Sequence, residues 1–394
     1  MSYLIFCSSE VGGFPFKITE TLNRHGVETY YISLAPNSND HNSTEFHYGK
    51  RKEDWDLSLL FDKNLHNPAK DITLLNYIKS KYNIKGAFAT GHKSYFLDKA
   101  GIEYKYWSYG SDLDQYCKKF IFPERFPIWK ELILTPYFLL TFCRMQRVSI
   151  IRADALMISM HQVKEQRALC PKSKLFFLPH LIPVEHYEVL SKKKIEAKNK
   201  ICKSIGTERF FFSSARHFWF GKNRAFTDYK GNDCILYSFM NYLNISGDKA
   251  SKLILIRKGP DVKESISLIY RLGIDHYVIW IDEMKRDDLW DYYQGASMCF
   301  GQFGTPALTY AVVEPLSTAT PCVTFIGDYD RSIPFYKTMP PILNSRDPEE
   351  IACFMYKLTS DKEHESHMCY ASWLWAKENC SEEKFVRAFV KEMS

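Results

Sequence analysis

Between residues 251 and 325, short apolar runs alternate with longer segments of helical period. The apolar runs cover residues 253–256, 277–281, 298–300 and 322–325, and each has the length of a buried strand. Between the runs, apolar side chains recur at helical spacing, at Ile266 and Ile269 in one segment and at Leu289 and Tyr293 in another. Strands that alternate with helices form a parallel sheet covered on both faces, so this half is predicted to be an α/β domain. Its ligand is expected at the carboxyl ends of the strands.

The loop at residues 301–314 is the most informative part of this half. Thr305 followed by Pro306 is typical of a helix start, so a helix is predicted from about Pro306. Its first turn would offer backbone N–H groups and a positive dipole end to a phosphate. Glu314 would lie about two turns further along the same face, where its carboxylate could accept hydrogen bonds from two ribose hydroxyls. The alternative, a solvent-exposed helix residue, stays open, although the neighbours of Glu314 are apolar.

Length and composition suit a globular protein of two domains. The 394 residues are long for one hydrophobic core, and 45% hydrophobic with 25% charged residues is ordinary. The formal charge of +6 permits attraction to nucleotide phosphates or anionic lipid without requiring either. Basic residues are not gathered with aromatic residues on one element, so no nucleic-acid partner is expected. The 11 cysteines show neither a CxxC pair nor a metal-ligand spacing, which favours reduced thiols in the cytoplasm.

No segment has the length and hydropathy of a signal peptide or a membrane-spanning helix. The nearest approach is residues 120–142, an aromatic and apolar stretch that prolines interrupt and arginines follow. This stretch either lies on a membrane surface or forms a buried connecting segment. The expected location is therefore the cytoplasm, with peripheral contact to the cytoplasmic face of the membrane as one alternative.

The first half of the chain shows the same alternation of strand and helix. Residues 2–7 form an apolar strand, Gly12 and Gly13 follow it, and a helix that ends at His25 and Gly26 leads to a second strand. The two glycines let the backbone approach a ligand closely, or they simply turn the chain. Further strands are predicted at residues 86–90, 104–108, 155–159 and 175–178, and a final helix is predicted to start near Ser381.

A polar turn follows the strand at residues 104–108. It consists of Tyr109, Gly110, Ser111 and Asp112, and it falls at the carboxyl end of the strand, where a flexible turn can meet a substrate. Ser111 or Asp112 could equally cap the next helix.

Two cations mark the start of the second half. Arg216 follows a strand predicted at residues 210–212, and Lys230 precedes Gly231 at the start of a helix. Two cations and a helix N-terminus are what a diphosphate needs, for binding and for stabilisation as a leaving group. For Arg216 alone, a surface salt bridge is the competing interpretation. The predicted domains are residues 1–190 and 204–377, with a basic linker at 191–203 and a helix at 378–394 that packs back on the first domain.

These motifs resemble the retaining glycosyltransferases of family 4, whose fold is called GT-B. The resemblance covers most of the chain and is strongest at residues 210–323. There the family has a strand followed by Arg and then Lys-Gly-x-Asp, as at Arg216 and Lys230, and a strand ending in a glycine-rich turn, as in LILIRKGPD. It also has a strand after Leu-Gly-Ile, as in LGIDHYVIWIDEM, and a Glu before Thr-Pro, as from Glu314 to Pro321. The resemblance implies an α/β fold of two Rossmann-like, doubly wound parallel-sheet domains that face a cleft.

The resemblance also implies roles for individual residues. Arg216, Lys230 and Glu314 would carry catalysis, the two cations by holding the donor diphosphate and Glu314 by holding the ribose hydroxyls. The rest of the donor site would include Gly12, Gly13, Gly259, Asp282, Glu283, Met284, Ala307, Leu308 and Thr309. The acceptor side would include Tyr109, Gly110, Ser111 and Asp112. Enzymes of this family transfer a sugar from a nucleotide-sugar, here linked to UDP or GDP, with retention of the anomeric configuration, and neither a cofactor nor a metal is implied.

Two departures from the family pattern bear on function. Pro306 replaces the first of the family's two glutamates, and Tyr109 stands where a histidine is frequent. The first hypothesis is a hexosyl-type glycosyltransferase with a glycan or lipid-linked acceptor, in the assembly of cell-surface polysaccharide such as lipopolysaccharide, O-antigen or capsule. The second, which Pro306 favours, is a catalytically weak nucleotide-sugar-binding or scaffolding protein of the same fold. A third, an epimerase of the GT-B fold, would need additional acid–base side chains that no motif supplies.

Overall fold

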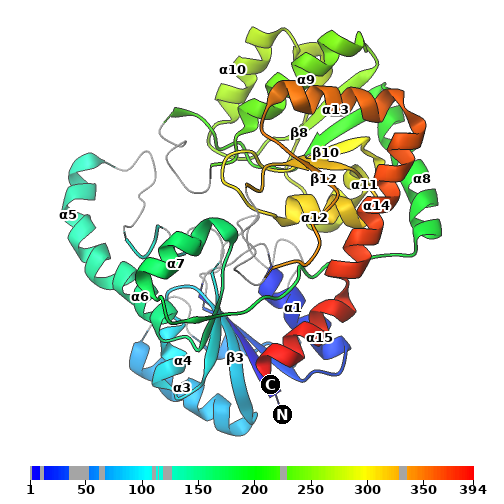
Figure 1. Ribbon diagram of the computed structural model, residues 1–394. Helices are drawn as coiled ribbons and strands as arrows, with labels where there is room; N and C mark the ends of the chain where they lie inside the picture. The colour runs from blue at the N-terminus through cyan, green and yellow to red at the C-terminus, as the bar shows by residue number, and fades with distance from the viewer. Residues whose placement is uncertain are drawn as a thin grey trace. The chain divides into compact units, whose positions relative to one another are not determined.

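The computed structural model describes residues 2–8, 13–34, 53–61, 67–108, 112–113, 115–118, 127–221, 229–327 and 335–394. The chain divides into two compact units (Figure 1). The N-terminal unit contains the described residues up to Leu178 together with residues 386–394, and the C-terminal unit contains most residues from Pro179 to Phe385.

The N-terminal unit is built on a parallel sheet of six strands in the order β2-β1-β3-β4-β5-β6. The strands are β1 (Ser2–Cys7), β2 (Thr29–Ser33), β3 (Ile84–Thr90), β4 (Tyr104–Trp107), β5 (Ala155–Met157) and β6 (Lys174–Leu175). The helices are α1 (Phe14–Arg24), α3 (Pro68–Lys81), α4 (Tyr95–Lys99), α5 (Ile128–Phe138), α6 (Arg144–Ile151) and α7 (Val163–Leu169), joined by most of α15 (Glu382–Met393). All six residues of β1 are buried, which is typical of a parallel strand covered on both faces.

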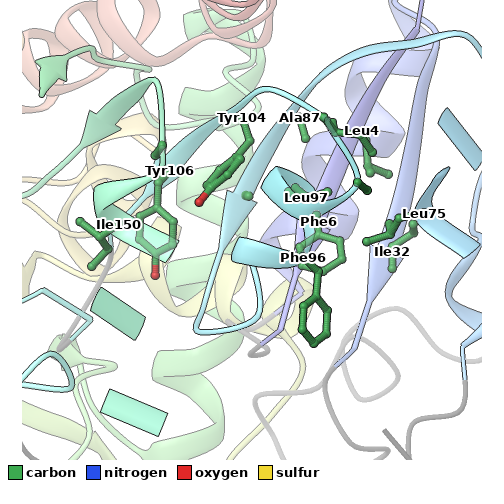
Figure 2. Close-up of a cluster of buried hydrophobic side chains, with 14 of the residues drawn as sticks. Leu4, Phe6, Ile32, Leu75, Ala87, Phe96, Leu97, Tyr104, Tyr106 and Ile150 are labelled. Carbon is green, nitrogen blue, oxygen red and sulfur yellow. The ribbon is translucent and has the colours of Figure 1, made fainter. Parts of the chain in front are cut away.

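The two faces of this sheet have separate cores. Leu4 and Phe6 alternate with Ile5 along β1, so they share one face, where they pack with Leu75 of α3 and Phe96 of α4 (Figure 2). The opposite face is aromatic. There the ring of Phe88 of β3 stacks with that of Trp107, with 5.7 Å between the ring centroids. The ring of Phe389 of α15 lies edge-on to Phe88 and to Tyr3, at centroid distances of 6.2 Å and 5.7 Å. The last residues of the chain thus complete the first unit.

The C-terminal unit contains a second parallel sheet of six strands, in the order β12-β11-β10-β7-β8-β9. The strands are β7 (Arg209–Ser213), β8 (Ser251–Ile256), β9 (Val278–Ile281), β10 (Met298–Phe300), β11 (Cys322–Thr324) and β12 (Ile342–Asn344). The helices are α8 (Tyr187–Ile205), α9 (Asn232–Ser246), α10 (Val262–Leu272), α11 (Arg286–Gly295), α12 (Tyr310–Ser317), α13 (Pro348–Ser360) and α14 (Lys362–Cys380). The four strands predicted between residues 253 and 325 are confirmed as β8 to β11, and the α/β class with two doubly wound sheets is confirmed.

The basic segment at residues 191–203 is a helix, and the prediction of a linker there is wrong. It forms most of α8, which ends at Gly206 in a left-handed conformation and buries Leu190, Ala197 and Ile201. These three residues lie at helical spacing, but the lysines between them mask the pattern. Gly295 of α11 lets α8 approach closely, because a Cβ there would lie 2.9 Å from the backbone nitrogen of Lys198. Among the helices in the described ranges, none is long and apolar enough to cross a membrane.

Candidate functional site

The order of the strands in the C-terminal unit reverses between β7 and β10. In doubly wound sheets the ligand lies in the crevice outside the carboxyl ends of the strands at such a reversal. Arg216 follows β7, Gln302 follows β10, and Lys230 lies just before α9. The two cations predicted from the sequence therefore belong to the loops where this fold binds its ligand.

The backbone around Lys230 is fixed by the loop that follows β10. The carbonyl of Tyr229 accepts a hydrogen bond from the N–H of Thr305 at 3.0 Å. Gly304 permits this approach, because a Cβ at that position would overlap Tyr229. Lys230 Nζ donates to Gln302 Oε1 at 2.9 Å, and Gln302 Nε2 donates to the carbonyl of Thr305 at 2.8 Å. The ammonium is thus held in one place by contacts that span two loops.

The charged form of Lys230 is disfavoured in the protein without a ligand. Burial, together with the neighbouring positive charge of Arg216, lowers the pKa of Lys230 to about 7. The Arg216 guanidinium lies over the ring of Phe218, 5.3 Å from its centroid. Two cations this close favour a multiply charged anion, because a diphosphate would offset the repulsion and return Lys230 to its charged form.

The helix that carries Glu314 begins later than the sequence predicted. α12 starts at Tyr310, with Thr309 as an extended N-cap, so the predicted start at Thr305 and Pro306 is wrong. The reason is that the N–H of Thr305 is hydrogen-bonded to the segment before α9, which keeps this part of the chain in a loop. Glu314 therefore lies in the second turn of α12, about one turn from its start.

Glu314 is buried, with 5% of its surface exposed, so the alternative of a solvent-exposed helix residue is wrong. Its carboxylate forms an ion pair with Arg286, the first residue of α11, whose side chain is 14% exposed. The hydroxyl of Tyr293 donates to Ser214 Oγ at 2.9 Å, and burial together with the charge of Glu314 holds the pKa of Tyr293 well above its usual range. Tyr293 thus connects Glu314 to the loop after β7, two residues before Arg216.

Arg286 is the centre of a polar and aromatic cluster that the sequence did not reveal. Its guanidinium lies 5.0 Å from the ring centroid of Tyr310, whose hydroxyl accepts a hydrogen bond from the N–H of Leu181 at 3.3 Å. The ring of His180 lies edge-on to Tyr310 at 4.7 Å, and its Nδ1 is 2.6 Å from the hydroxyl of Tyr336. Burial and the charge of Arg286 contribute to lowering the pKa of His180 to about 4, so His180 is neutral at pH 7.

Gly259, one of the predicted donor-site residues, lies against protein backbone. It follows β8 with φ of +108°, and a Cβ there would overlap the backbone of His217. The N–H of His217 donates to the carbonyl of Lys258 at 2.6 Å, which joins the loops after β7 and β8. Gly259 therefore fixes the loop that carries Arg216.

We expect Gly259→Ala to lower the free energy of unfolding by about 2–4 kcal/mol, since it combines a strained φ with a backbone clash. Urea denaturation of the purified protein measures this change. Gly247→Ala is the matched control, because Gly247 also has a positive φ, +62°, but open space at its Cβ position. Equal losses for the two variants would contradict the close packing at Gly259.

The other predicted donor-site residues differ in their surroundings. Asp282 is exposed after β9, whereas Glu283 forms an ion pair with Lys258. Met284 and Ala307 are half-buried, and Leu308 is buried. Thr309 serves as the N-cap of α12. The loops after β8 and β9 are thus tied to each other by the Lys258–Glu283 pair.

Most of the residues predicted in the N-terminal unit lie outside the described residues, namely Gly12, Tyr109, Gly110 and Ser111. Gly13 has φ of +71° and directly precedes α1. Asp112 is buried, and its Oδ2 accepts a hydrogen bond from the hydroxyl of Tyr106 at 3.1 Å. The same hydroxyl accepts from the amide of Gln146 at 2.7 Å and from the N–H of Gly91 at 3.1 Å. Asp112 is therefore part of an internal hydrogen-bond network.

Across the ranges that the structure covers, no three His, Cys, Asp or Glu side chains gather in a way that could hold a metal ion. No protein-family model and no curated protein matches the sequence.

Similarity to solved structures extends over the whole chain. The glycosyltransferase of Rickettsia africae covers 100% of this chain over 97% of its own, with a TM-score of 0.64 and 12% identity. The match to HepE of Anabaena, crystallised with UDP, covers 100% of this chain and 99% of HepE, with a TM-score of 0.59 and 12% identity. The match to WaaG, a glycosyltransferase involved in lipopolysaccharide biosynthesis, covers 100% of both chains, with a TM-score of 0.56 and 12% identity. The chain therefore has the GT-B fold of these glycosyltransferases, as the sequence predicted.

Proposed function

We propose that this protein is a glycosyltransferase that uses a nucleotide-sugar donor. The observation that carries the proposal is the pair of Lys230 and Arg216 at the reversal of the second sheet, where their mutual repulsion favours a diphosphate. Glu314, connected to the same loop through Tyr293 and Ser214, is the candidate partner of the ribose hydroxyls. UDP is the favoured nucleotide over GDP, because a structural neighbour binds UDP.

In this proposal the bond between the anomeric carbon and the diphosphate oxygen breaks while the acceptor hydroxyl attacks from the same face, which retains the configuration. The proton of that hydroxyl passes to the departing diphosphate. Lys230 and Arg216 stabilise the charge that develops on the leaving oxygen, so no metal or other cofactor is required of the protein. The transferred unit is a hexose, with Pro306 in place of a carboxylate beside it.

The acceptor belongs to the same proposal. It is a glycan or a lipid-linked sugar in the assembly of cell-surface polysaccharide, and the protein acts in the cytoplasm in peripheral contact with a membrane. Lipopolysaccharide assembly is favoured by the fold similarity to WaaG.

The second candidate is a protein that binds a nucleotide-sugar without turning it over. Pro306 supports it, because a proline cannot make the contact that a carboxylate makes to a donor sugar. Release of UDP from UDP-sugars above the uncatalysed rate would exclude this candidate.

We expect a selective rise in Tm, about 2–5 °C at a hundredfold excess of ligand over Kd, when UDP or its sugar conjugates are added. A thermal-shift screen of UDP, GDP, CDP and ADP, each with and without EDTA, measures this rise and identifies the base. A shift that persists with EDTA supports binding without a metal. No shift with any nucleotide would contradict the proposed function.

A further inference from the structure

The helix α5 presents an apolar surface to solvent. None of its eleven residues is buried, and large apolar side chains on α5 and at the second residue after its end are 60–76% exposed, namely Ile128, Trp129, Leu132, Ile133, Tyr137 and Leu140. At 100° per residue these side chains fall on one half of the helix circumference. Glu131 lies on the other half. In Figure 1, α5 extends beyond the end of α6, away from the sheet of its own unit.

We propose that this surface, called here the α5 surface, docks the protein on an anionic phospholipid membrane. The proposal deepens the proposed function, on which it rests for the need of a lipid-linked acceptor. Six large apolar side chains on one helix face form a patch that is unusual on a monomeric protein and typical of an interaction surface.

Cations continue the same face and favour lipid as the partner. A π-helical turn, Leu139–Cys143, joins α5 to α6, where Arg144 and Arg147 are exposed and lie one and two turns beyond Leu140. Apolar side chains followed by arginines match the boundary between acyl chains and anionic headgroups. Trp129 and Tyr137 also suit that boundary, because each combines an apolar ring with a polar group.

The polar groups of α5 also permit shallow insertion. Thr135 donates its hydroxyl to the carbonyl of Glu131 at 2.7 Å, and Thr141 donates to the carbonyl of Tyr137 at 2.7 Å, so neither hydroxyl loses a water partner on burial. Pro136 lies inside α5 and has no N–H to offer the carbonyl of Leu132.

The test is co-sedimentation of the full-length protein with vesicles of phosphatidylcholine alone and with vesicles that contain a quarter phosphatidylglycerol. We expect binding to the anionic vesicles, and Leu132→Ser combined with Ile133→Ser should lower the partition coefficient about tenfold or more. Arg144→Gln combined with Arg147→Gln should lower binding to anionic vesicles only, by about tenfold at low salt. The matched control is Ile195→Ser with Ile245→Ser, at positions 63% and 50% exposed on other helices, which should bind as the wild type does.

Three results would overturn the proposal that the α5 surface docks on lipid. The first is no binding to anionic vesicles, and the second is unchanged binding by the Leu132 and Ile133 variant. The third is a concentration-dependent dimer in light scattering that this variant abolishes while its vesicle binding stays the same. The Tm shift with UDP is measured on the same preparations. If UDP binds and vesicles do not, the α5 surface is wrong and the proposed function stands, whereas the opposite result rejects the proposed function alone.

Discussion

Lys230→Ala should weaken the binding of UDP by at least about 30-fold and lower kcat for sugar transfer by about 100-fold or more. The reason is that burial and the neighbouring charge of Arg216 both disfavour the charged ammonium until an anion arrives. Its hydrogen bond to Gln302, a neutral amide, positions the ammonium without offsetting its charge. Isothermal titration calorimetry with UDP and a radiolabelled donor assay measure the two effects. Gln302→Ala is an informative companion, because it removes the positioning of Lys230 and keeps its charge.

The pH dependence of UDP binding separates a titrating lysine from a merely cationic site. The pKa of Lys230 is about 7 in the free protein, and a bound diphosphate raises it, so binding takes up a proton at pH values above 7. Affinity should therefore fall as the pH rises from 7 to 9, by about tenfold per unit at most. Lys230→Arg retains the charge but cannot titrate in this range, and its affinity should be flat. If the UDP affinity of Lys230→Arg still falls as the pH rises, a group other than Lys230 titrates.

The sequence predicted the strands β7 to β11 of the second sheet well because each contains a short apolar run and clear helical segments separate β8 to β11. The last four residues of β8 and all of β10 are buried. Short apolar runs of this kind between helical segments are typical of buried strands. The position of Arg216 and Lys230 followed from the same pattern, since parallel strands place their carboxyl ends at one edge.

The failures of sequence reasoning have a common physical cause, which is contact between distant parts of the chain. Thr305 and Pro306 have the local signature of a helix start, but hydrogen bonds to a segment about 75 residues earlier override it. The lysines of α8 conceal the apolar residues that pack on α11. Gln302 and Arg286 carry no motif, and only the structure shows that they contact Lys230 and Glu314.

The Arg286–Glu314 pair offers the largest expected effect on stability. Arg286→Met should lower the free energy of unfolding by about 3–5 kcal/mol and Tm by about 10 °C, because it leaves a carboxylate buried without its cation. Differential scanning calorimetry measures the change. Lys200→Met is the matched control, since Lys200 pairs with Asp291 on the same helix, α11, but both side chains are largely exposed. This control should leave Tm almost unchanged.

The double variant Arg286→Met with Glu314→Gln distinguishes an ion pair from simple loss of packing. Removing both charges should restore at least half of the stability lost in Arg286→Met, because the remaining amide is neutral. UDP binding should nevertheless stay weak in the double variant, because a glutamine has one acceptor oxygen where a carboxylate offers two to the ribose hydroxyls. A double variant that regains both stability and UDP affinity would show that Glu314 serves the fold alone.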